Sequence, residues 1–232
     1  MKKPIISLKK PLVKGEVREI APNIFGVIIK DRYQRAMLFC RYQEFYESPY
    51  KEIRGKYFTM EKYMDLYREK NGEKFFTYPG DWSGYNIPSE KLWKALDTFS
   101  KKGRGEYDEI MSLIIHCCEN YPLRLGKPRV KKWYLLGADS FDSSIMDHEV
   151  AHGLYYTNKE YREKCDSLIS EMKKADYNKM KKVLIKIGYA DDVKIIDDEI
   201  QAYMSTGLIN KFDVASLKKY TKNFEKNFRS YR

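Results

Sequence analysis

Two histidines four residues apart, with a glutamate directly after the first, constrain this chain more than any other feature. His148, Glu149 and His152 form the pattern H-E-x-x-H within the segment SSIMDHEVAHGLYY, residues 143–156. Four residues make about one turn of an α-helix, so the two imidazoles share one face only if the segment is helical. The chain has three histidines, and chance would produce this pattern on the order of a few times in a thousand such chains. We therefore interpret the segment as a helix with a functional histidine pair.

A helical projection of residues 145–156 separates the segment into two sides. The side that we expect to pack against the rest of the protein comprises Met146, Val150 and Leu154. The side that we expect to face a cleft comprises Ile145, His148, Glu149, His152 and Tyr156. One side of the helix is thus predicted to pack against the protein, and the opposite side to carry the histidines and the glutamate.

Two imidazoles on one helical turn suit zinc, which takes nitrogen, sulfur or oxygen ligands in a tetrahedral shell. A catalytic zinc site uses three protein ligands and leaves the fourth position for water, which Glu149 could reach as a base. A third ligand must come from elsewhere. No histidine follows His152, so the candidates are a downstream carboxylate or the upstream His116.

The segment VKIIDDEIQAYMS, residues 193–205, offers such a carboxylate. Its helical projection has an apolar face made of Ile195, Ile196, Glu199, Ile200, Ala202 and Tyr203. The opposite, polar face comprises Lys194, Asp197, Asp198, Gln201 and Ser205. A buried carboxylate needs a cation or hydrogen-bond donors, and zinc would satisfy Glu199. Glu199 is therefore the favoured third ligand, and Asp198 is the alternative.

With HEVAH at 148–152 and EIQA at 199–202, the chain resembles the glutamate-type zincin metallopeptidases, the thermolysin-like gluzincins. In these enzymes H-E-x-x-H lies on one helix, and a glutamate on a later helix, commonly followed three residues on by a small residue, completes the zinc shell. The resemblance covers about residues 130–207 and identifies no particular family. The chain differs from the gluzincin pattern in two ways. The interval between His152 and Glu199 is longer than in thermolysin, and Tyr203 stands where many gluzincins carry an aspartate.

The resemblance implies a zinc-dependent peptidase with Zn²⁺ on His148, His152 and Glu199, acting on a peptide or protein substrate. The metal would lower the pKa of a bound water toward about 7, and Glu149 would take its proton and return it to the leaving amine. Tyr156 and Tyr203 are the candidates for stabilising the oxyanion. The segment KKWYLL, residues 131–136, is either an edge strand that aligns the substrate or an ordinary buried strand.

The remaining pattern predicts a helix-rich α+β protein, and the resemblance implies a zincin-like fold with a small mixed sheet beside the metal-binding helix. We expect one domain over residues 1–232, with a mixed part at 1–127, a metal-binding core at 128–210 and a basic C-terminal helix at 211–232. Predicted strands cover 24–30 and 130–139. Predicted helices run from about 31 to 47, 59 to 71, 89 to 102, 107 to 120, 144 to 156, 159 to 174, 176 to 188 and 193 to 205, and from about Asp213 onward. The second of these is predicted to have Thr59 as its N-cap and Gly72 beyond its end, and the third to have Ser89 as its cap.

The formal charge of +11 attracts anionic partners such as nucleic acid. The alternative function is therefore a basic nucleic-acid-associated protein whose zincin-like site is structural or inactive. No apolar run is long enough for a membrane span or a signal peptide, so we expect a cytoplasmic protein with reduced cysteines.

Overall fold

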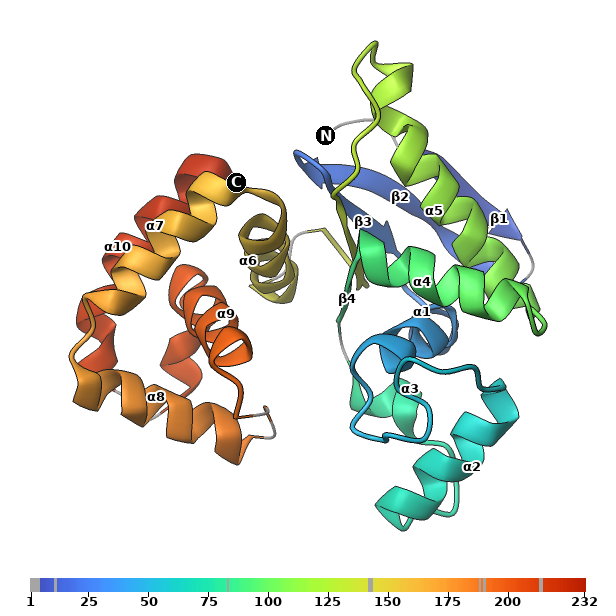
Figure 1. The fold of residues 1–232 in the computed structure, drawn as a ribbon, viewed down its shortest axis with the longest axis horizontal. Coiled ribbons are helices and arrows are strands. Elements are labelled where there is room, and N and C mark those ends of the chain that lie inside the picture. Colours follow the sequence, from blue (N-terminus) through green and yellow to red (C-terminus); the bar gives the residue numbers. More distant parts are fainter. Residues whose placement is uncertain are drawn as a thin grey trace. The chain divides into compact units, whose positions relative to one another are not determined.

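The computed structural model describes residues 5–10, 12–82, 84–141, 144–187, 189, 191–212 and 215–232 (Figure 1). The chain divides into two compact units, Met1–Phe141 (unit 1) and Asp142–Arg232 (unit 2). This boundary lies 14 residues beyond the predicted border at 127/128, because the strand that precedes the histidine helix belongs to unit 1. The single domain over residues 1–232 stays a prediction.

Unit 1 is built on a five-stranded mixed sheet in the order β1-β2-β3-β5-β4. Its strands are β1 (Ile6–Lys10), β2 (Val13–Ala21), β3 (Ile24–Ile28), β4 (Tyr85–Pro88) and β5 (Tyr134–Ala138). The two predicted strands are confirmed as β3 and β5, which pair in parallel with Ile24 opposite Tyr134. β5 is hydrogen-bonded on both sides, to β3 and to β4, and all its residues are buried. Of the two interpretations of 131–136, the ordinary buried strand is therefore confirmed and the edge strand is wrong.

The β1–β2 hairpin had no counterpart among the predicted elements. Two of the five residues of β1 and four of the nine residues of β2 are charged, and β2 buries only every fourth residue: Val13, Val17 and Ala21. Such a pattern does not alternate with the period of two that identifies a half-buried strand. Pairing with β3 orders β2, and β1 follows as the outer strand.

The helices of unit 1 are α1 (Arg32–Glu47), α2 (Met60–Asn71), α3 (Tyr78–Asp81), α4 (Ser89–Ser100) and α5 (Glu106–Arg124). The predicted cap of α2 is confirmed, since the Thr59 hydroxyl accepts from the Lys62 amide and Gly72 ends the helix at φ 67°. Ser89, predicted as a cap, instead accepts a hydrogen bond from the Trp133 amide. A core shared by α1, α4, α5 and the sheet includes Phe25, Phe39 and Phe99.

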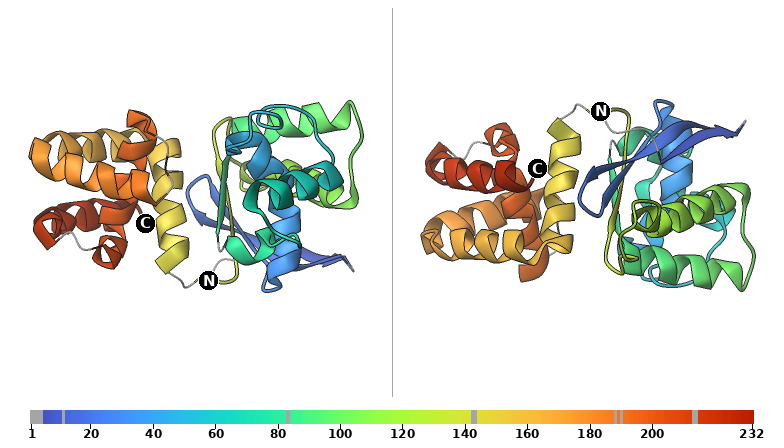
Figure 2. Two further views of the ribbon diagram at one scale, coloured as in Figure 1. Left: turned by 90° about the horizontal axis from the view of Figure 1, so that it is seen from below. Right: turned by 90° about the horizontal axis from the view of Figure 1, so that it is seen from above.

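All the described elements of unit 2 are helices or 3₁₀ turns. It comprises α6 (Ser144–Thr157), α7 (Lys159–Ser170), α8 (Lys174–Lys186), α9 (Val193–Ser205), the short 3₁₀ turns η1 (Leu208–Lys211) and η2 (Ala215–Leu217), and α10 (Lys218–Tyr231). Helix α9 packs against α6, α7, α8 and α10, which makes it the centre of the unit. In the two views of Figure 2, α6 runs crosswise to α7 and α10. Asp213, where the last helix was predicted to begin, lies outside the described residues.

Together the two units confirm a helix-rich α+β chain with a small mixed sheet. None of the helices in the described ranges combines the length and the apolar character that crossing a bilayer requires.

Candidate metal centre

Helix α6 presents the two histidines as its sequence predicts. Met146, Val150 and Leu154 on the packing side are at most 2% exposed. The opposite side does not open to solvent: His148, Glu149 and His152 are 8%, 9% and 4% exposed. Because α6 packs against α9, the middle of the side expected to face a cleft is buried, whereas Ile145 and Tyr156 at its two ends are half-buried.

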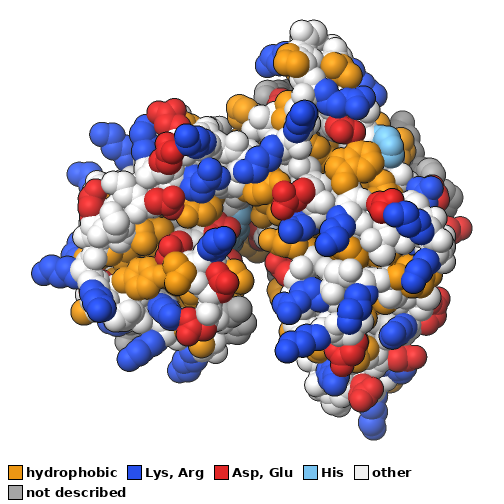
Figure 3. Space-filling model, viewed as in Figure 1, with side chains coloured by type: hydrophobic (Ala, Val, Ile, Leu, Met, Phe, Trp, Pro, Cys, Tyr) orange, Lys and Arg blue, Asp and Glu red, His pale blue; other side chains and the backbone are white. Residues whose placement is uncertain are grey.

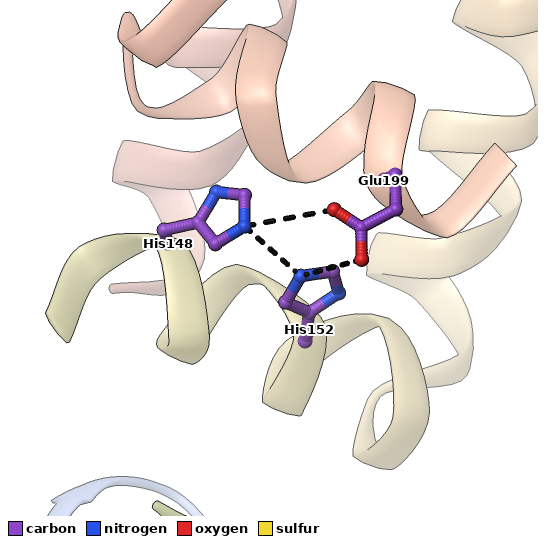
Figure 4. Close-up of side chains that lie close together, drawn as sticks. All are labelled: His148, His152 and Glu199. Carbon is purple, nitrogen blue, oxygen red and sulfur yellow. Dashed lines mark hydrogen bonds and ion pairs between the residues drawn. The ribbon is translucent and has the colours of Figure 1, made fainter. Parts of the chain in front are cut away.

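The imidazoles of His148 and His152 meet the carboxylate of Glu199, which α9 contributes (Figure 4). The two Nε2 atoms lie 3.2 Å apart. Glu199 Oε2 lies 3.7 Å from His148 Nε2, and Glu199 Oε1 lies 3.5 Å from His152 Nε2. Within the described ranges this is the one group of three or more His, Cys, Asp or Glu side chains arranged to share a cation.

The spacing and the chemistry of these three groups fit zinc. Zinc bonds of about 2.0 to 2.1 Å place tetrahedral ligand atoms about 3.3 to 3.4 Å apart, close to the separations found here. Glu199 Oε2 is buried and accepts no hydrogen bond from any described residue. A buried carboxylate oxygen without a donor is costly, and a cation would satisfy it.

Without a metal ion, the negative charges of the cluster are balanced by a bound proton. Burial would lower the pKa of His152, but the carboxylates of Asp198, Glu199 and Glu149 outweigh burial and raise this pKa to about 10. Burial would raise the pKa of Glu199, yet the positive charge of His152 and the adjacent His148 hold it below its usual value. The carboxylates thus favour a positive charge at this position, which a proton or a metal ion can supply.

Asp198 orients the second histidine. His152 Nδ1 donates to Asp198 Oδ1 at 2.9 Å, which directs Nε2 toward Glu199 and His148. Metal-binding histidines almost always donate their second ring nitrogen to such an acceptor, which fixes the ring and raises its basicity. Asp198 was the alternative ligand in our sequence interpretation; it instead supports His152 and is not among the three clustered groups.

A buried hydrogen-bond chain holds Asp198 in place. Gln201 Nε2 donates to Asp198 Oδ1 at 2.9 Å, and the Tyr161 hydroxyl donates to Gln201 Oε1 at 2.8 Å. Gln201 is fully buried and Ser205, 3.2 Å from the Tyr161 hydroxyl, is 3% exposed. Gln201 and Ser205 lie on the polar face of the helical projection, yet both are buried, because α9 is surrounded by helices on several sides.

Tyr203 lies next to the cluster, and a second tyrosine joins it. The Tyr203 ring meets the His148 ring edge to face, with centroids 4.7 Å apart, and its hydroxyl lies 3.4 Å from that of Tyr189. The Tyr189 hydroxyl also borders the Glu199 carboxylate, whose charge, together with burial, raises the pKa of Tyr189. Sequence reasoning missed Tyr189, which precedes α9 and belongs to no periodic segment.

The other predicted site residues take different places. Glu149 lies close enough for its charge to raise the pKa values of His152 and Tyr203. Tyr156 is partly buried in the last turn of α6, and its role stays a prediction. His116 belongs to unit 1, where it is exposed on α5 and meets the Trp93 ring edge to face at 5.1 Å. It is not a member of the cluster.

Comparison of the chain with protein-family models, with curated proteins and with solved structures finds no match.

Proposed function

We propose that the chain is a zinc-dependent metallopeptidase that hydrolyses peptide bonds. The observation that supports this most is the convergence of His148, His152 and Glu199 around the buried, unsatisfied Glu199 Oε2. The resemblance of HEVAH and EIQA to the gluzincin pattern supports the same function.

Two imidazole nitrogens and one carboxylate are the protein ligands of a catalytic rather than a closed structural zinc site. A zinc ion held by these side chains would supply a bound water with a pKa of about 7 and would polarise a substrate carbonyl. His148 and Glu199 would hold the ion from two helices, and Asp198 keeps the His152 ring oriented toward the other two side chains.

Glu149 is the proposed general base. It directly follows His148, is 9% exposed, and acts electrostatically on His152 and Tyr203, so its carboxylate borders the proposed reaction site. The carboxylate would take a proton from the attacking water and pass it to the nitrogen of the leaving amine. Burial favours this role, since a base shielded from solvent exchanges its proton with the substrate rather than with bulk water.

Tyr203 is the proposed donor to the developing oxyanion. Its ring is fixed against His148 and its hydroxyl lies beside Tyr189, so the phenol can donate near the metal ligands. Tyr156 remains the second candidate, because it follows His152 by one helical turn.

The test is peptide cleavage by the zinc-loaded full chain, followed by mass spectrometry on a mixture of unstructured peptides of varied sequence. We expect internal cleavages by the wild type that stop on chelation and return with zinc. The Glu149→Gln variant should bind one zinc per chain and cleave at least 100-fold more slowly. The matched control, Glu163→Gln at an exposed position of α7, should cleave like the wild type.

Cleavage by zinc-loaded Glu149→Gln at the wild-type rate would refute the role of Glu149. A wild type that binds one zinc per chain and cleaves none of the peptides would refute the general peptidase, and would point to a structural site.

A further inference from the structure

The positive charge of the chain is concentrated in unit 1. Residues 1–141 hold 27 of the 44 Lys and Arg residues but only 18 of the 33 Asp and Glu residues, which gives a formal charge of +9. Residues 142–232 carry the remaining +2. Unit 2, which contains the candidate metal centre, is therefore close to neutral, and the source of any attraction to an anionic partner is unit 1.

One segment of unit 1 combines this charge with exposed apolar side chains. Residues 123–132, LRLGKPRVKK, form the end of α5 and the loop that leads toward β5, and we call them the basic tip. They contain five Lys and Arg residues, and no acidic residue occurs between Glu119 and Asp139. In Figure 1 this part of the chain extends away from the sheet, at the top of the view.

The basic tip has a defined shape. The Leu125 amide donates to Pro122 O at 2.9 Å, the Gly126 amide to Leu123 O at 3.1 Å and the Lys127 amide to Pro122 O at 3.0 Å. Gly126 has a φ of 69°, the left-handed conformation that ends many helices. The helix thus ends in a tight turn that holds its side chains outward.

The two leucines of the turn are the unusual feature. Leu123 and Leu125 are each 50% exposed, on either side of the exposed Arg124. Figure 3 shows apolar side chains among Lys and Arg side chains at this end of unit 1. A projecting turn with exposed leucines surrounded by cations has the chemistry of an interfacial membrane contact, in which apolar groups enter the lipid and cations meet the head groups.

We propose that the basic tip docks unit 1 on an anionic lipid surface. Nucleic acid fits this segment less well, because single strands are held by exposed aromatic rings and the basic tip has none. The nearest rings pack inward: Trp133 is 1% exposed, and Tyr121 meets Phe25 edge to face. The proposal concerns unit 1 and does not depend on the proposed peptidase activity.

The test is sedimentation of the full chain with vesicles of phosphatidylcholine alone or with 30% phosphatidylserine. We expect binding to the anionic vesicles that falls steeply between 50 and 500 mM salt, and none to neutral vesicles. Each Lys or Arg near an anionic surface strengthens binding about fivefold, so reversal of three charges should weaken it by more than 100-fold. The variant is Arg124→Glu with Lys127→Glu and Lys131→Glu.

Two further variants separate a lipid contact from general electrostatics. The control Lys51→Glu with Lys62→Glu and Lys74→Glu makes the same change of charge at exposed positions elsewhere in unit 1, and should bind clearly better than the tip variant. Leu123→Ser with Leu125→Ser should weaken vesicle binding about tenfold, whereas Leu113→Ser, also exposed on α5, should not.

The proposal is overturned if the wild type does not bind anionic vesicles at 50 mM salt, or if the tip and control variants bind equally. It is also overturned if the chain prefers a single-stranded oligonucleotide to the vesicles and the leucine variant keeps full binding. This preference for the oligonucleotide would assign the basic tip to nucleic acid.

Discussion

At the scale of single residues, the neighbouring carboxylates Asp198 and Glu199 have different tasks. Glu199 joins the two histidines, whereas Asp198 accepts from His152 Nδ1 at 2.9 Å. Asp198, the residue before Glu199, thus supplies the partner of one histidine. His148 Nδ1 has no hydrogen-bond partner among the described residues, so the support is confined to His152.

Asp198→Asn should therefore weaken zinc binding by about 10- to 100-fold, as is usual when the partner of a metal-binding histidine is changed. The measurement is zinc affinity by competition with a chromophoric chelator. Asp197→Asn is the matched control, since Asp197 accepts from the Tyr177 hydroxyl at 2.9 Å and contacts no proposed ligand. Equal affinities of the two variants would contradict the role of Asp198.

Glu44 is a buried carboxylate of unit 1, far in sequence from the metal centre. Burial raises its pKa above the ordinary 4.5, and the nearby hydroxyls of Ser48, Tyr63 and Tyr78 offset this only in part. The folded state therefore binds the Glu44 proton more tightly than the unfolded state does. The stability that this provides is complete below about pH 4.5 and is lost as pH rises through the raised pKa.

Glu44→Gln should consequently raise the melting temperature at pH 7, and the gain should shrink as pH falls toward 4.5. A change of about 1 kcal/mol moves the melting temperature of a protein of this size by about 2 to 4 °C. Thermal unfolding followed by circular dichroism from pH 4 to pH 8 checks this. A gain that grows toward low pH has the wrong sign and would refute it.

The sequence predicts which three side chains meet between α6 and α9 but not their surroundings. Spacing places His148 and His152 on one turn, and an acidic residue within an apolar face identifies Glu199. Gln201 and Ser205 fall on the polar face of the helical projection, and the projection does not show whether a polar face is exposed or buried. A buried glutamine with partners for both ends of its amide cannot be recognised from its own helix, since those partners come from elsewhere.

At the scale of elements, the buried guanidinium of Arg41 holds α1 against its neighbours within unit 1. The Arg41 guanidinium pairs with Asp108 on α5 and donates to Phe58 O from Nε at 2.9 Å and from Nη2 at 2.7 Å. It also lies 3.9 Å from the centroid of the Phe99 ring. Asp108 in turn accepts from the Gly105 amide at 2.8 Å, which caps α5. One arginine thus connects two helices and a loop.

Arg41→Met should destabilise the protein by about 3 to 5 kcal/mol, because it leaves Asp108 buried without its cation. The free energy of unfolding in urea measures this. The control is Arg68→Met, which removes an exposed pair with Asp65 and should cost less than about 1 kcal/mol. A loss at Arg41 no larger than that at Arg68 would show that the buried pair does not hold α1.

The helices were largely predictable, and the sheet was predictable only in part. Helices such as α2 carry their own caps and periodicity, so local sequence defines them. The position of β5 inside the sheet depends on its pairing with β3 and with β4. The first residues of these strands, Ile24 and Tyr85, lie 110 and 49 residues before Tyr134, where β5 begins. Apolar runs identify buried strands, but they do not reveal the neighbours on either side.

At the scale of the whole molecule, the excess of positive charge and the candidate metal centre belong to different units, which the composition of the whole chain does not reveal. Unit 1 carries the positive charge and the basic tip, and unit 2 carries the candidate metal centre. The charge of +11 is therefore no guide to what surrounds the histidines. A metal that binds only in unit 2 should stabilise mainly that unit.

Hydrogen exchange with and without zinc should show this division. Zinc at 100 times its dissociation constant adds about 2.7 kcal/mol to the state that binds it, so amides of α6 and α9 should exchange about 100-fold more slowly. Amides of β3 and α1 in unit 1 should change little. Protection spread evenly over both units would contradict a site confined to unit 2.

The central claim is that His148, His152 and Glu199 hold zinc, and anomalous diffraction at the zinc edge tests it most directly. We predict one peak about 2.0 to 2.2 Å from both Nε2 atoms and from a Glu199 carboxylate oxygen, and no such peak in crystals of Glu199→Ala. A crystal soaked in zinc without a peak between these side chains, or with a peak that leaves Glu199 unbound, would contradict the claim.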